Sequence, residues 1–354
     1  MSEQRLAQLI AAIPPLDEKA MRAAAARQDI LTKPQGSLGR LERLSIQVAG
    51  ITGQVRPRLV HKVITTMAGD HGVVAEGVSA YPQEVTAQMV YNFLRGGAAI
   101  NVLARHVGAR VVVVDMGVAV DLAPHPELVT KKVAKGTGNI AREPAMTREQ
   151  AIQAILNGAA VVEAELEKGL DILGTGDMGI GNTTPSAAIA AAITGRAAAE
   201  IVGRGTGVDD AGLARKVAVV QKALALHRPD PQDGLDVLAK VGGFEIGGLA
   251  GAILAAAAHR KPVVIDGFIS TAAALIAVTL APQVRPYLIA AHRSQEKGHR
   301  IMLDWLGLEP VLDLDLRLGE GTGAALAMSI VEAACKVLDE MATFAEAGVS
   351  EKSA

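Results

Sequence analysis

The sequence is poor in cysteine and aromatic residues, and it has no long block of one charge. Its single cysteine, Cys335, excludes an internal disulfide framework and a thiolate metal site, which favours a reducing, cytoplasmic compartment. Only 2% of residues are aromatic although 50% are hydrophobic, so Ala, Val, Ile and Leu must build the core. The 35 basic and 37 acidic residues are interspersed, which makes nucleic acid an unexpected partner.

A secretion signal and a membrane span are also lacking. The first residues never develop an apolar block, so no export is expected. The longest charge-free stretch, Gly267 to Val284, only just reaches the roughly 18 residues of a candidate span. It contains polar residues and Pro282 and directly follows a strand-like segment. We therefore expect a buried crossover helix and no membrane partner.

What the sequence does contain is an alternation of short β-branched runs and longer helical stretches, with 37 glycines at many of the turns. The predicted strands are Val63–Met67, Arg110–Val114, Leu170–Leu173, Pro262–Ile265, Tyr287–Ala290 and Val311–Leu314. The predicted helices between them are Ala87–His106, Arg148–Lys168, Pro185–Ile193, Leu213–Leu226, Gly248–His259 and Ser270–Leu280. This order predicts an α/β protein with a doubly wound, mostly parallel sheet, whose ligands bind at the carboxyl ends of the strands.

The two ends of the chain differ from this middle part. Asp17–Arg27 is an Ala-rich helical stretch, and Gly323–Met341 is a long amphipathic one. We expect them to pack together as a small helical subdomain of residues 1–28 and 331–354. Residues 29–330 would then form a large α/β catalytic domain.

Three glycines after a predicted strand, Gly174, Gly176 and Gly179, match the G-x-G-x-x-G pattern of dinucleotide sites. The match is weak, because the acid expected about 20 residues later, at the end of the next strand, is missing. A tight turn without a ligand is one alternative. An anion site is another.

The anion site follows from Asn182 and Thr183, which precede Pro185 and an Ala-rich helix. Proline near a helix start leaves free backbone N–H groups where the helix dipole favours a phosphate. A second glycine-rich loop, centred on Gly205, precedes another helix.

A metal site has to be considered at His292, Glu296 and His299, because the i, i+4, i+7 spacing would place them on one helix face. Gly298 argues against a helix there. Ser294 in the same segment is a better contact for a phosphate oxygen.

The segment around Tyr81 and Gln88 could line a flat aromatic pocket, with the ring of one residue and the amide of the other. A tyrosine next to Pro82 is equally consistent with a surface turn.

A carboxylate between glycines, at Gly319, Glu320 and Gly321, follows the last predicted strand. Without flanking side chains Glu320 can approach a substrate closely, and partial burial would raise its pKa toward that of a general base. The alternative is an acid that interacts with the dipole of the following helix.

Ordered motifs over nearly the whole chain resemble the nicotinate-nucleotide:dimethylbenzimidazole phosphoribosyltransferases, which make the lower nucleotide of cobalamin. They are Lys33–Gly39, Ala68–Tyr81, Asn92–Asn101, Met178–Thr184, Asp266–Ala274 and Leu316–Ala325. Two positions depart from the family pattern: Asp177 stands where relatives can have glutamate, and Ala291 where serine is common.

The resemblance implies a Rossmann-like sheet, a small domain made from both termini, and a homodimer. It also implies that Glu320 is the general base and that no metal or redox cofactor is needed. The substrates would be nicotinate mononucleotide and a benzimidazole base. The residues implied to contact the nucleotide are Asp177, Gly179, Asn182, Thr183, Gly205, Lys216 and Ser294; Gly319 would also bind substrate, and Tyr81 and Gln88 would border the benzimidazole.

Two rival functions remain at this point. One is an NAD-dependent oxidoreductase that uses the Gly174 motif, and the other is a non-catalytic protein that binds a nucleotide or a benzimidazole.

Overall fold

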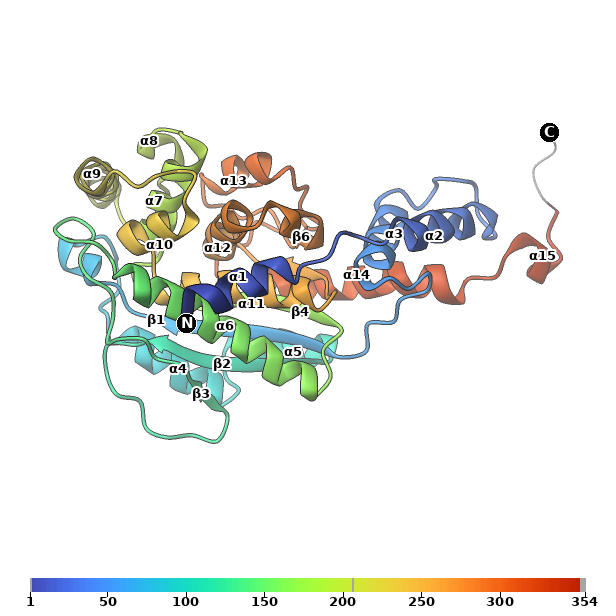
Figure 1. Ribbon diagram of the computed structural model, residues 1–354, viewed down its shortest axis with the longest axis horizontal. Coiled ribbons are helices and arrows are strands. Elements are labelled where there is room, and N and C mark those ends of the chain that lie inside the picture. Colours follow the sequence, from blue (N-terminus) through green and yellow to red (C-terminus); the bar gives the residue numbers. More distant parts are fainter. Residues whose placement is uncertain (1, 206, 351–354) are drawn as a thin grey trace.

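A computed structural model describes residues 2–205 and 207–350 of the chain, with a six-stranded parallel sheet at its centre (Figure 1). The strands are β1 (Lys62–Gly69), β2 (Ala109–Gly117), β3 (Leu128–Thr130), β4 (Ile172–Met178), β5 (Val263–Ile265) and β6 (Leu288–Ala290). Their order is β3-β2-β1-β4-β5-β6, and every neighbouring pair is parallel. The predicted doubly wound sheet is confirmed.

The strand order reverses direction between β1 and β4. From β1 the chain adds β2 and β3 on one side, and then it returns to add β4, β5 and β6 on the other. The loops that leave β1 and β4 therefore diverge. In sheets of this kind the crevice between such loops is where ligands bind.

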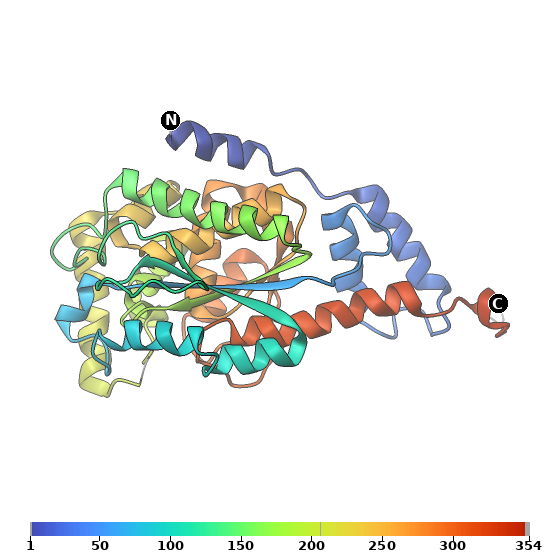
Figure 2. The ribbon, with the colours of Figure 1, turned by 90° about the horizontal axis from the view of Figure 1, so that it is seen from below.

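Helices cover both faces of the sheet (Figure 2). One face is covered by α6 (Arg148–Glu167), α11 (Phe244–Ala258) and α12 (Phe268–Leu280); the other by α4 (Val85–Leu94), α5 (Ala99–Val107) and α14 (Thr322–Glu340). Alternate residues of β1 accordingly enter different cores: Val63 and Met67 pack on the first face, and Ile64 and Ala68 on the second.

The Ala- and Gly-rich composition is explained by how closely α6 and α11 cross. A Cβ atom added to Gly158 would lie 1.8 Å from the carbonyl oxygen of Gly248, and one added to Gly251 would lie 1.8 Å from that of Ile155. Only glycine permits this contact between the two backbones.

The other elements connect or flank these layers. They are η1 (Gly72–Glu76), α7 (Thr183–Thr194), α8 (Ala198–Ile201), α9 (Asp210–His227), α10 (Gly234–Val241), η2 (Pro282–Tyr287), α13 (His299–Leu306) and α15 (Phe344–Ala347). The segment Gly267–Val284 contains the buried crossover helix α12, as predicted. Among the described residues no helix is both long and apolar enough to span a bilayer.

Two predicted elements are wrong. Residues Val311–Leu314 form no strand. The Val311 N–H donates to the Ala290 carbonyl and Leu312 forms an isolated bridge with His292, but the pairing does not extend to Leu314. The stretch Ala87–His106 is two helices. Gly96 adopts a φ of +75°, and the Asn101 side chain accepts the N–H of Ala98, so a new helix begins at Ala99.

The ends of the chain pack in two places. Helix α2 (Glu18–Ile30) packs on α3 (Arg40–Thr52) and α14, and the Arg27 guanidinium donates to the carbonyl oxygens of Leu338 and Met341. Helix α1 (Ser2–Ala11) instead lies across α6 and α11 (Figure 1). The division into residues 1–28 with 331–354 and 29–330 stays a prediction, and residues 1 and 351–354 lie outside the described part.

Candidate active site

A cavity of about 460 Å³ opens at the carboxyl ends of β4, β5 and β6, beside the reversal of strand order. Its polar wall comes from the ends of these strands and from the loop before α14; its lining includes Asp177, Asn182, Thr183, His292, Ser294, Glu296, Arg317 and Glu320. The volume lies in the range of small-molecule sites, about 300–1,000 Å³.

Glu320 lies at this wall in a left-handed conformation, with a φ of +63°. Its Oε2 accepts the backbone N–H of Ile100 at 3.2 Å, near the start of α5, and its carbonyl oxygen accepts the hydroxyl of Thr66 at 2.9 Å. The side chain is only 6% exposed. Burial raises the pKa of the Glu320 carboxyl, the Ile100 N–H opposes this, and the charge of Asp266 adds to it.

Asp177 ends strand β4 and is the second acid of the cavity. Its Oδ2 accepts the side-chain N–H of Asn182 at 2.9 Å. Burial, followed by the charge of Asp266, raises the pKa of Asp177 to about 8, although the Asn182 hydrogen bond acts in the opposite direction. At neutral pH Asp177 is therefore predominantly a carboxylic acid, which can donate a hydrogen bond.

The amino end of α7 and the buried Lys216 form the cationic part of the site. Lys216 lies on α9, is 1% exposed, and donates through Nζ to the Thr183 hydroxyl at 2.6 Å and to the Gly203 carbonyl at 3.2 Å. Burial lowers the pKa of Lys216 to about 8, while Glu296 raises it. The helix begins at Thr183, two residues before Pro185, and it directs its positive dipole end at the cavity.

Ser294 is held in place by the buried imidazole of His299. The Nδ1 atom of His299 accepts the backbone N–H of Ser294 at 2.9 Å. Because the Thr271 hydroxyl already donates to the Gly267 carbonyl, Nε2 of His299 donates to that hydroxyl, at 2.9 Å. This arrangement requires a neutral ring, and burial, with the nearby His292, lowers the pKa of His299 to about 3.

An apolar wall completes the cavity opposite these polar groups. It consists of Tyr81, Val85, Met89, Met178, Ile180, Phe268, Ile269 and Leu318. Tyr81 is 53% exposed, at the mouth. Gln88 is exposed on α4 and does not line the cavity.

The structure brings most of the predicted site residues together. Eight of the predicted substrate-binding residues line the cavity with Glu320, and Lys216 lies behind Thr183; the eight are Tyr81, Asp177, Gly179, Asn182, Thr183, Gly205, Ser294 and Gly319. Thr206, in the same loop as Gly205, lies outside the described residues. The exception is Gln88.

The glycine pattern at Gly174 does not form a dinucleotide loop. Gly174 and Gly176 lie inside β4, and the segment around Glu320 and α14 crosses directly over them. A Cβ atom on Gly176 would lie 2.3 Å from the carbonyl oxygen of Glu320, and one on Gly174 would lie 2.8 Å from Cε of Met328. These glycines are required for close packing, which removes the basis for the oxidoreductase interpretation.

The His292, Glu296, His299 spacing does not form a helix face either. Helix α13 begins only at His299, after Gly298. The rings of His292 and His299 have centroids 6.1 Å apart, and no group of metal-binding side chains occurs in the described ranges.

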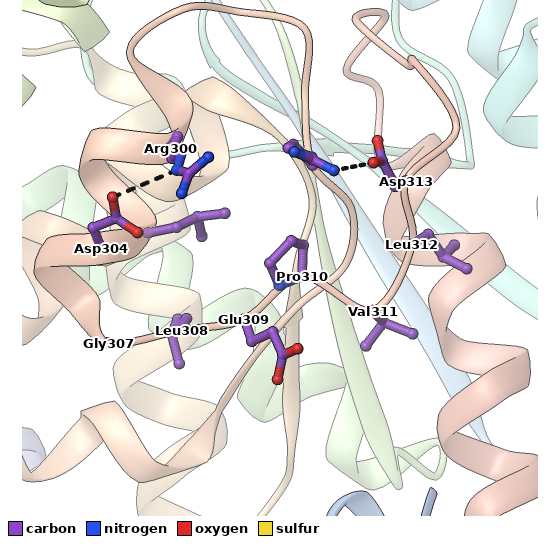
Figure 3. A pocket seen from close by; sticks show the side chains of 11 residues that line it. Arg300, Asp304, Gly307, Leu308, Glu309, Pro310, Val311, Leu312 and Asp313 are labelled. Carbon is purple, nitrogen blue, oxygen red and sulfur yellow. Dashed lines mark hydrogen bonds and ion pairs between the residues drawn. The ribbon is translucent and has the colours of Figure 1, made fainter. Parts of the chain in front are cut away.

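A second, larger cavity of about 600 Å³ lies apart from these groups (Figure 3). It is lined by α13 and the segment from Gly307 to Asp313. Arg300 pairs with Asp304 and Arg293 with Asp313, while Glu309 pairs with Arg40 and Arg43 outside the cavity. It contains none of the cavity residues described above, so we place the chemistry in the smaller cavity.

Sequence reasoning missed Asp266 and the cavity role of Gly267, Phe268 and His292. All four lie within a few residues of the end of β5 or β6. The signal that could have found them is their position at the carboxyl ends of predicted strands.

Comparisons with known proteins point to one group. A family model described as phosphoribosyltransferase matches residues 13–349. Proteins named nicotinate-nucleotide–dimethylbenzimidazole phosphoribosyltransferase from Roseiflexus sp. (strain RS-1) and Chloroflexus aggregans are 68% and 67% identical over 347 residues, which is 98% of this chain and 98% of each relative. The crystal structure of such an enzyme from Thermus thermophilus is 48% identical, with a TM-score of 0.91 over 95% of this chain and 100% of that one.

Proposed function

This chain belongs to the nicotinate-nucleotide–dimethylbenzimidazole phosphoribosyltransferase family, and we propose that it moves the 5-phosphoribosyl group of nicotinate mononucleotide to 5,6-dimethylbenzimidazole. The products would be nicotinate and α-ribazole 5′-phosphate, the nucleotide of the cobalamin lower ligand. The observation that carries the proposal is that one cavity combines Glu320, an apolar wall suited to a flat base, and the amino end of α7 with Lys216 behind it, which is suited to a phosphate.

The reaction requires one proton acceptor. A neutral benzimidazole attacks C1′ of the ribose through its unprotonated nitrogen, while the bond from C1′ to the nicotinate nitrogen breaks. Nicotinate leaves as a neutral ring with its carboxylate, so the leaving group needs no acid. The proton on the other benzimidazole nitrogen must be removed, and Glu320 is the buried carboxylate placed to accept it.

The groups around Glu320 have complementary tasks. The amino end of α7, the Thr183 hydroxyl and Lys216 would bind the phosphate, and Ser294 would add a hydroxyl contact. Asp177, as a neutral acid, would donate to a ribose oxygen. The apolar wall would hold the base so that attack occurs from the face opposite nicotinate, which converts a β-nucleotide into an α-nucleotide.

The test is transfer by the purified chain, followed by mass spectrometry for α-ribazole 5′-phosphate. Glu320→Gln should lower turnover by about 10²-fold or more while nucleotide binding, measured by calorimetry, persists. Glu309→Gln, whose side chain is 70% exposed, is the control that should keep full turnover.

Distinct outcomes refute distinct parts. Wild-type-like turnover of Glu320→Gln would remove Glu320 as the base. Ligand binding without any transfer by the wild-type chain would identify a non-catalytic binder.

The homodimer implied by the resemblance, and the cytoplasmic location expected from the single cysteine and the absence of an export signal, are further parts of this proposal. Light scattering of the purified chain would test the first, and fractionation of cells that express it would test the second.

A further inference from the structure

Asp266 connects the end of β5 to the turn that presents Glu320. It is 1% exposed, and its two carboxylate oxygens accept the N–H groups of Gly321 at 3.1 Å and Ala324 at 2.9 Å. These donors belong to the start of α14, whose own N-cap, Gly321, has no side chain. Asp266 therefore caps this helix from a neighbouring strand end.

Contacts with strands β1 and β4 also hold the turn that contains Glu320. The Thr66 hydroxyl binds the Glu320 carbonyl, and the missing Cβ of Gly176 makes room for it. A non-glycine residue in the left-handed region, such as Glu320, persists only where the surrounding structure imposes that conformation. Asp266 fixes the residue immediately after it.

The titratable and charged side chains around Glu320 come from only some of the elements that pack against it. Strand β4 contributes Asp177, the end of β5 contributes Asp266, the end of β6 contributes His292, and the turn itself contributes Arg317. The start of α5 offers only a backbone N–H, and β1 offers the Thr66 hydroxyl.

His292 is the basic group next to Asp266. Its Nε2 lies 3.8 Å from Asp266 Oδ1, and the ring is 1% exposed. It fits there because Gly323 lacks a Cβ atom, which would lie 2.0 Å from Cδ2 of the ring. The Nδ1 atom of His292 has no hydrogen-bond partner among the described residues.

We infer that Asp266 is a positioning residue for the transfer reaction: it builds the Glu320 turn and places a second buried carboxyl group behind that of Glu320, with the His292 ring beside it. The inference rests on the proposed role of Glu320. A nearby negative charge favours the protonated form of a carboxyl group, so Asp266 strengthens Glu320 as a base. Burial and Asp266 both raise the pKa of Glu320.

The experiment is the pH profile of kcat/KM at saturating nicotinate mononucleotide, calculated for the neutral form of dimethylbenzimidazole so that protonation of the substrate itself does not contribute. In the wild type, activity should fall at acid pH as Glu320 becomes protonated, and the residual activity of Glu320→Gln should lack this limb. Asp266→Asn should lose roughly 10²-fold in rate through displacement of Glu320. Its acid limb should move to lower pH by about one unit.

A second variant separates position from charge. Thr175→Val removes the hydroxyl that accepts the Asp266 N–H at 3.2 Å, so it should lower the rate without moving the acid limb. Thr175→Val carries the test of positioning if Asp266→Asn does not fold, as judged by circular dichroism.

The outcomes distinguish this inference from the proposed function. An acid limb that is absent in Glu320→Gln but unmoved in folded Asp266→Asn would overturn the role of Asp266 alone. Where Asp266→Asn does not fold, a wild-type rate in Thr175→Val would overturn it. Full turnover of Glu320→Gln would overturn the role of Glu320, and the role of Asp266 with it.

Discussion

Lys216 allows a prediction about how nucleotide affinity depends on pH. Its ammonium group has three N–H donors, of which two are used by Thr183 and Gly203, which leaves one for a substrate phosphate. Burial lowers the pKa of this ammonium to about 8, against an ordinary value of 10.5. The group is therefore charged below about pH 8 and increasingly neutral above it.

Loss of the Lys216 charge at high pH should weaken nucleotide binding. A phosphate binds the charged form, so kcat/KM for the nucleotide should be level between the acid limb of Glu320 and about pH 8. Above about pH 8 it should fall, by about tenfold per pH unit once most of the lysine is neutral. Bound phosphate stabilises the ammonium. Consequently the limb should be pronounced in kcat/KM, which reports the free enzyme, and weak in kcat.

Lys216→Met should remove both the charge and the limb. A hydrogen bond to a charged group contributes about 1.5–3 kcal/mol, which corresponds to a roughly 10- to 150-fold loss in kcat/KM at about pH 7. Lys216→Arg keeps its charge at every pH of the assay and should lack the limb. Lys222→Met, an exposed position on the same helix, is the control and should behave as wild type.

The assay is the initial rate of α-ribazole 5′-phosphate formation against nucleotide concentration between about pH 6 and about pH 10. Because Asp177 also has a pKa of about 8, Lys216→Met is compared with Lys216 in an Asp177→Asn background, where of these two groups only the lysine can titrate in this range. A kcat/KM of Asp177→Asn that stays level through this range, or a basic limb that persists when Lys216→Met is added to it, would refute the assignment of the phosphate to Lys216.

Two further predictions concern stability. Because the pKa of Asp177 is about 8 when folded and 3.8 as its ordinary value, its stabilising contribution is complete below pH 3.8 and lost as pH rises toward 8. The difference in melting temperature between Asp177→Asn and the wild type should therefore shift in favour of the variant by about 2 °C or more over this pH range. A difference that does not change with pH would contradict the assignment of Asp177 as a buried, neutral acid. Gly251→Ala should lower the free energy of unfolding in urea by about 1–3 kcal/mol, because its Cβ would overlap the Ile155 carbonyl; an unchanged midpoint would argue against the close crossing of α6 and α11.

The strands of the sheet were predictable where β-branched residues form a continuous run. Strands β1, β2 and β5 coincide with such runs, and β6 lies within its predicted strand. Strand β4 overlaps its predicted strand, Leu170–Leu173, only at Ile172 and Leu173, because its remaining residues include two glycines and an acid. Strand β3 is three residues long and owes its conformation to pairing with β2, which its own residues do not indicate. Val311–Leu314 has the composition of a strand, but its hydrogen bonds to the sheet region involve only Val311 and Leu312.

The break in the predicted helix Ala87–His106 shows how a local error hides a functional contact. Apolar periodicity continues across Gly96 and Gly97, so the two helices look like one. The break creates a new helix start at Ala99, and only because of it is the Ile100 N–H free to bind the Glu320 carboxylate. In a continuous helix that N–H would be bonded within the helix.

Glu320 could be singled out from its glycine neighbours. The strand-end position of Asp266 marks it as a possible site residue, but its contact with the Glu320 turn could not be predicted, because its partners lie 55 and 58 residues away and meet it only in the folded sheet. Asp177, Asp266 and Glu320 each have a pKa that burial raises, so each carboxylate is costly to bury. Their concentration at one end of β4 and β5 is not required by packing, since apolar residues would fill the same space more favourably. A site that must remove a proton from a neutral base does require it, because neighbouring buried acids shift one another's pKa values toward neutral pH.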